Sequence, residues 1–152
     1  MNIKSLFITT LAIASYLLVG CSTTQEVTLA KLAPSKKIVS VAQVADADNS
    51  TQMNGNLEAA LQKEGLSLKA PLPLGTKKSA DVDALVSYVD YWRWDLAMYM
   101  KNLTVNLYDA ETGDLLVSGR WNDSTLHGFR DAKVIMQGLV SEMLAKLRAA
   151  TK

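Results

Sequence analysis

The segment LTVNLYDAETGDLLVSGRW, residues 103–121, constrains the fold most, because two strand-like stretches flank a turn. DAETGD can form a short loop in which Gly113 takes a left-handed conformation, so the flanking stretches are predicted to pair as an antiparallel hairpin. In the first stretch, apolar and polar residues alternate with the period of two that marks a half-buried strand: Leu103, Val105 and Leu107 against Asn102, Thr104 and Asn106. The chain is therefore expected to contain a sheet with one apolar face and one polar, wet face.

The C-terminal segment DAKVIMQGLVSEMLAKLRAATK predicts an amphipathic helix of about five turns. Its other side mixes acids and bases instead of being basic, which favours packing on the sheet over a membrane-surface role. The residues expected to face the sheet recur at steps of three and four: Ala132, Ile135, Met136, Leu139, Val140, Met143, Leu144 and Leu147.

Three further elements are expected between residues 37 and 73. KIVSVAQV predicts a first strand, and residues 50–64 predict a helix that Gly65 stops. Residues 66–68 can start a short strand, but Pro71 and Pro73 indicate a loop after it. The expected fold class is thus α/β (α+β): one domain over residues 37–152, with a mixed, mostly antiparallel sheet of four to five strands and two helices on one face.

The aromatic segment YVDYWRWDLAMYM, residues 88–100, predicts a central strand with aromatic residues on both faces. An unpaired buried carboxylate is costly, so Asp90 should either face solvent or be reached by Arg93 or Arg120. One side of the strand is a candidate surface for a partner or ligand. By parity that side holds Tyr88, Asp90, Trp92 and Trp94, and the other holds Val89, Tyr91 and Arg93.

Composition excludes several classes of function. With 16 basic and 15 acidic residues, the chain has no strong field to attract nucleic acid. His127 is the only histidine, so no two-histidine metal site exists, and Ser124 near it in sequence does not assemble a triad. We expect no catalytic residue, no metal, no cofactor and no enzymatic activity.

The first 20 residues differ from the rest of the chain. Lys4 precedes the apolar run LFITTLAIASYLLVG, which is typical of a secretory signal peptide. The run is short for a membrane-spanning helix, which needs about 20 predominantly apolar residues. Residues 1–20 are therefore predicted to be a signal peptide, followed by a flexible tether over residues 21–36.

The end of that run, LVGC, resembles the lipobox of bacterial lipoproteins. The resemblance implies that a signal peptidase recognises Leu18, Val19 and Gly20, and that Cys21 carries a diacylglycerol and an N-acyl chain. Ser22 after the cysteine looks like the outer-membrane sorting signal of Gram-negative bacteria. These features imply a protein held by lipid on the periplasmic face of the outer membrane.

The order of the expected elements, over about residues 37–150, resembles the small periplasmic domain shared by LpoB-type lipoproteins, CsgG and the N-terminal domain of TolB. The strand DALVSYVDY followed by the hairpin is also similar to small envelope lipoproteins. The resemblance implies fold more than function. Our main hypothesis is a non-enzymatic envelope adaptor or assembly subunit that acts through an envelope protein partner, with its oligomeric state open. The alternative is a small-molecule or glycan (peptidoglycan) binding module that stacks its ligand on Tyr88, Trp92 and Trp94.

Overall fold

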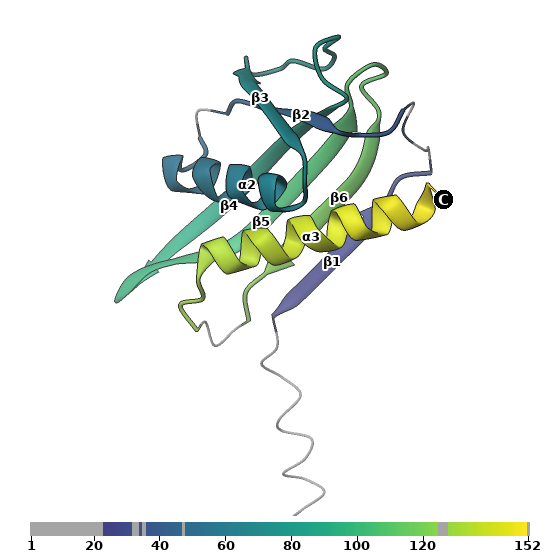
Figure 1. Ribbon diagram of the computed structural model, residues 1–152. Helices are drawn as coiled ribbons and strands as arrows, with labels where there is room; N and C mark the ends of the chain where they lie inside the picture. The colour runs from purple at the N-terminus through teal and green to yellow at the C-terminus, as the bar shows by residue number, and fades with distance from the viewer. Residues whose placement is uncertain (1–22, 32–33, 35, 47, 125–127, 152) are drawn as a thin grey trace, which may run out of the picture.

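The computed structural model describes residues 23–31, 34, 36–46, 48–124 and 128–151. Within them, one six-stranded sheet is covered on one face by two helices (Figure 1). The strands are β1 (Thr24–Leu29), β2 (Ser40–Val44), β3 (Ser67–Leu72), β4 (Ala84–Asp95), β5 (Ala97–Asp109) and β6 (Leu115–Asn122); the helices are α2 (Thr51–Lys63) and α3 (Ala132–Ala150). The predicted α+β class is confirmed, with six strands where four to five were expected.

The sheet has the order β1-β6-β5-β4-β2-β3. Its first four strands pair antiparallel, and the predicted hairpin joins β5 to β6 around Gly113, whose φ is +82°. β2 pairs parallel with both β4 and β3, and α2 provides the crossover from β2 to β3. The sheet is therefore mixed and mostly antiparallel, as predicted.

Residues 24–29 form edge strand β1 instead of part of a flexible tether. Val27 is buried, the Gln25 amide donates to Glu142 of α3 at 2.7 Å, and the Lys146 ammonium donates to the Val27 carbonyl at 3.2 Å. The outward residues of TQEVTL are polar, so the sequence pattern does not distinguish this segment from a linker. It forms a strand because its backbone pairs with β6. The domain thus begins near Thr24, ahead of the predicted start at residue 37.

The short strand after α2 also extends further than predicted. β3 runs through Pro71 to Leu72, although proline cannot donate in a ladder. β3 is the edge strand at the other side of the sheet, and an edge strand leaves one row of backbone groups unpaired, which is where proline is tolerated.

The main core lies between the sheet and the helices. All eight residues predicted to form the apolar side of α3 are buried, and they pack with buried residues of α2, β4, β5 and β6. Gly119 of β6 permits this close approach, because a Cβ there would lie 2.6 Å from the Met143 sulfur and 2.9 Å from a Leu139 methyl. The helix-covered face is therefore tightly packed against α3.

A second, smaller core lies at one end of the opposite face. It contains buried Ala42, Val82, Leu85 and Ala110, with partly buried Tyr108 against them. Neither α2 nor α3, the two helices of the described residues, covers this face, which is called the helix-free face below. Among the described residues, no helix is long and apolar enough to cross a membrane.

Candidate interaction surface

Tyr88 is a core residue, because the N-terminal part of α2 packs over it. The residue is 1% exposed, and its hydroxyl lies 2.7 Å from the Asn54 side-chain oxygen and 3.2 Å from the Ser50 carbonyl. The Asn49 amide donates to the Tyr88 carbonyl at 2.9 Å. Burial, and then the charges of Asp90 and Asp46, raise the pKa of Tyr88 well above its usual value. This ring is not available for stacking on a ligand.

Asp90 has structural partners of its own. The Ser50 hydroxyl donates to its carboxylate at 2.9 Å, and the Trp92 indole N–H donates to the same oxygen. Ser50 is the N-cap of α2, and a negative charge beside a helix N-terminus is favourable. Neither expected arginine is the partner: the Arg93 guanidinium lies 5.9 Å from the centre of the Tyr91 ring on the opposite face, and Arg120 also belongs to that face. Asp90 therefore fixes the start of α2 on β4.

The four residues of the predicted surface are thus divided between two places. Tyr88, Asp90 and Trp92 meet beneath α2, where Trp92 is partly buried against the core. Trp94 is 71% exposed, near the turn between β4 and β5. The four residues alternate along one side of β4, but α2 covers that side at Tyr88 and Asp90.

Other predicted site residues lie outside the described residues. These are Leu18, Val19, Gly20, Cys21 and Ser22 of the signal and lipidation region; His127, for which no site was predicted, also lies outside them. Ser124 is described and is buried.

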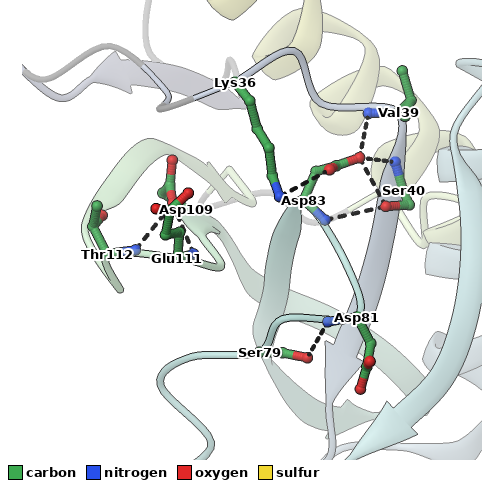
Figure 2. A network of polar contacts seen from close by, with 9 residues as sticks. All are labelled: Lys36, Val39, Ser40, Ser79, Asp81, Asp83, Asp109, Glu111 and Thr112. Atoms are coloured by element: carbon green, nitrogen blue, oxygen red, sulfur yellow. Dashed lines mark hydrogen bonds and ion pairs between the residues drawn. The ribbon is translucent and has the colours of Figure 1, made fainter.

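A polar network holds the beginnings of β2 and β4 together (Figure 2). One carboxylate oxygen of Asp83 accepts from the Ser40 hydroxyl at 2.8 Å and from the Ser40 and Val39 backbone N–H groups at 2.8 and 3.1 Å; the other lies 3.4 Å from the Lys36 ammonium. The Ser40 hydroxyl hydrogen bond, ahead of the other contacts, lowers the pKa of Asp83 to about 2. A carboxylate held ionised by so many donors suits a structural clamp better than proton transfer.

Asp109 makes a similar local contribution at the β5–β6 turn. Its carboxylate accepts from the Glu111 and Thr112 backbone N–H groups at 2.8 and 3.1 Å, as Figure 2 shows. Across the described residues, no group of three or more His, Cys, Asp or Glu side chains could hold a metal ion.

The helix-free face of the sheet is not covered by α2 or α3. Its side chains form hydrogen bonds across the strands: the Asn102 amide donates to the Asn122 side-chain oxygen at 2.6 Å, and the Asn122 amide donates to the Thr24 hydroxyl at 3.2 Å. The Ser118 hydroxyl donates to the Asn106 side-chain oxygen at 2.7 Å. The sequence predicted this polar face from the alternation in β5.

Apolar and aromatic groups break the polar character of the helix-free face on β4. Val89 is 60% exposed and Tyr91 is 51% exposed, with Arg93 over the Tyr91 ring. At the opposite end of the same face is a pocket of about 380 Å³ lined in part by Ser87 and Tyr108. The face can therefore offer hydrogen-bonding groups, one exposed aromatic ring and a small pocket to a partner.

A cleft of about 580 Å³ lies on the helix-covered side, at the C-terminal end of α3. Ile38, Leu66, Leu144 and Leu147 give it apolar walls. Arg148 on its rim is held by Glu64, at 2.9 Å from the carboxylate and 2.7 Å from the carbonyl, so this cation joins α3 to α2.

Comparison with solved structures finds similarity to several bacterial proteins. A PelC dodecamer from Paraburkholderia phytofirmans has 17% sequence identity and a TM-score of 0.50, over 82% of this chain and 96% of that chain. A PDZ domain protein from Parabacteroides distasonis has 14% identity and a TM-score of 0.49 over 91% of this chain and 39% of that one. TolB from Acinetobacter baumannii has 16% identity and a TM-score of 0.47 over 82% of this chain and 32% of that one. No family model matches the sequence, and no curated protein sequence is similar to it. At these identities the likeness to PelC shows the fold alone.

Proposed function

We propose that this chain is a non-enzymatic lipoprotein of the bacterial envelope, anchored to the periplasmic face of the outer membrane through lipid on Cys21. It acts as an adaptor or assembly subunit, and the helix-free face of the sheet contacts its protein partner. The observation that carries the second part is that face itself: helices cover one side of the sheet, while Val89 and Tyr91 lie exposed among hydrogen-bonding side chains on the other.

Two further observations support the proposal. Cys21 directly follows an apolar run that ends in LVG, as in lipoproteins. PelC, whose structure was solved as a dodecamer, shows that a protein with this fold can assemble from many copies. Contact with copies of the same chain is therefore one form that the assembly role can take.

Lipidation is tested by feeding cells an alkyne-labelled palmitate and measuring its incorporation into the protein. The wild-type chain should be labelled, and globomycin should arrest its processing. Cys21→Ala should abolish the label, because Cys21 is the only cysteine. A Cys21→Ala protein that is still labelled would contradict the anchor.

The contact face is tested with a photocrosslinking amino acid placed at Val89 on the helix-free face, or at exposed Gln62 on α2 as the matched control. Crosslinks should form from position 89 and not from position 62. Products at multiples of the chain's own mass would identify copies of this chain, and other masses would identify a different partner. Equal crosslinking from both positions, or none from position 89, would contradict the proposed face.

A glycan-binding module is the second candidate, and the helix-free face again favours it. Tyr91 offers an exposed ring for stacking, while the nearby Asn102 and Asn122 side chains offer hydrogen-bonding groups; sugar recognition needs this mixture. Titration with peptidoglycan fragments in a calorimeter should then give binding that Tyr91→Ala weakens. Absence of heat at millimolar fragment would favour the protein partner.

A further inference from the structure

The turn between β4 and β5 gathers exposed apolar side chains at one end of the molecule. Trp94 is 71% exposed, Leu96 88% and Met98 58%. Figure 1 shows this hairpin extending past the helices, so that its tip stands free of the rest of the domain. Phe129, half-exposed, packs edge-to-face on Tyr99 of the same hairpin, with ring centres 5.9 Å apart.

The tip carries a leucine where another residue would fit the backbone better. Leu96 has φ of +62°, a conformation that costs an L-residue with a large side chain and that glycine or asparagine adopts readily. Burial of the side chain does not offset this conformational free energy, because Leu96 is the most exposed of the large apolar residues described. An exposed leucine held in an unfavourable conformation indicates a role outside the folded domain.

The first described strand, β1, begins at this same end. Thr24 of β1 lies beside Asn122, Asn122 beside Asn102, and Asn102 beside Tyr91. The hairpin continues four residues past Tyr91 to Asp95, which is about 13 Å at about 3.3 Å per residue. Cys21 precedes Thr24 by three residues, which can span about 10 Å when extended. An acyl chain on Cys21 and the hairpin tip would therefore reach the same plane.

We propose that the hairpin tip is a second membrane contact: Trp94, Leu96 and Met98 insert into the interfacial layer of the lipid leaflet that holds the anchor. This inference rests on the proposed lipidation of Cys21. Tryptophan is enriched at the boundary between headgroups and acyl chains, and exposed leucine and methionine gain by leaving water. With both contacts made, the strands would run outward from the bilayer surface. The helix-free face would then point toward other proteins on the same membrane.

Trp94 itself can report the contact. The chain from Cys21 onward, which contains every described strand and helix, is coupled through its single thiol to a maleimide lipid in vesicles of phosphatidylethanolamine and phosphatidylglycerol. Brominated acyl chains should quench the tryptophan emission, and Trp94→Phe should remove most of that quenching, because Trp121 is buried and Trp92 partly buried. Equal quenching in wild type and Trp94→Phe would overturn the proposal.

A matched pair of leucine substitutions separates insertion from folding. Leu96→Asn suits the positive φ, so the domain should keep or gain stability while lipid quenching of Trp94 falls severalfold. Leu74→Asn is the control, since Leu74 is 69% exposed in the loop after β3, and its neighbour Gly75 lines a pocket with Gly113 at the opposite end of β5. Equal quenching of Trp94 in both variants would overturn the proposal.

Chemical coupling also separates this inference from the proposed anchor. Mass spectrometry of the protein from cells determines whether Cys21 is acylated. Acylation without lipid quenching of Trp94 would overturn the tip contact alone. Quenching without acylation would contradict the anchor and support the tip as a membrane-contacting site.

Discussion

The helix-covered and helix-free faces of the sheet are built by alternate residues of the same strands, yet they differ in burial and polarity. On β5, Leu103 and Val105 are buried against the helices, whereas Asn102 and Asn106 are half-buried on the other side and bonded to neighbouring strands. The covered face supplies most of the apolar core, and the free face keeps polar groups available. Alternate residues of one strand therefore serve the core on one side and stay partly exposed on the side that we propose for partner contact.

The largest expected difference in stability between the two faces concerns two adjacent residues of β5, Leu103 and Thr104. Leu103→Ala should lower the free energy of unfolding by about 2–5 kcal/mol, because the side chain is fully buried. Thr104→Ala, on the helix-free face, should change it by no more than about 0.5 kcal/mol. Urea unfolding followed by circular dichroism measures both, and similar losses would show that the free face is covered by something the domain needs.

A smaller effect is expected where the clamp joins β2 to β4. Asp83→Asn should lower the free energy of unfolding at pH 7 by about 2 kcal/mol, at about 1.4 kcal/mol per unit of pKa. Because folding lowers the pKa of Asp83 from 3.8 to about 2, the ionised carboxylate stabilises the fold fully above about pH 4, and this contribution is lost as pH falls toward 2. The difference between wild type and variant should therefore narrow in acid.

The control for the clamp is Asp81→Asn, because exposed Asp81 is two residues from Asp83 and donates its backbone N–H to the Ser79 hydroxyl, apart from the Asp83 contacts in Figure 2. It should unfold like wild type between pH 2 and pH 7. A difference between wild type and Asp83→Asn that stays constant over that range would contradict the role of the Asp83 charge.

The smallest effect compares two tyrosines of β4. Tyr88→Phe removes a buried hydroxyl that bonds to Asn54 and should lower the free energy of unfolding by about 1 kcal/mol. Tyr91→Phe, on the helix-free face, should leave it within about 0.5 kcal/mol. Thermal unfolding of the pair is the measurement. A larger loss for Tyr91→Phe would reverse the assignment of the two faces.

Local patterns predicted the elements that carry their own periodicity. The α3 residues and the β5–β6 hairpin followed from steps of three and four and from alternation around Gly113. β1 was missed because Thr24, Glu26 and Thr28 face outward, and only pairing with β6 distinguishes such a segment from a linker. The extension of β3 through Pro71 was missed because its edge position depends on the order of the sheet.

The candidate surface could be predicted only in part. Parity put Tyr88, Asp90, Trp92 and Trp94 on one side of β4, but it could not show that α2 would cover Tyr88 and Asp90 and leave Trp94 exposed. The hydrogen-bond partner of Asp90 is Ser50, 40 residues earlier in the chain. Arg93 of β4 and Arg120 of β6, the partners expected from the sequence, lie on the other face of the sheet.

Local sequence patterns predicted the α+β class, the amphipathic α3 and the alternation that divides β5 into two faces, because these depend on residues a few positions apart. Tertiary contacts place α2 over Tyr88 and Asp90, make β1 an edge strand beside β6, and bring the hairpin tip and Thr24 to the same end of the sheet. Those choices depend on contacts between segments distant in sequence, whose free energy is set by packing and strand pairing across the whole sheet.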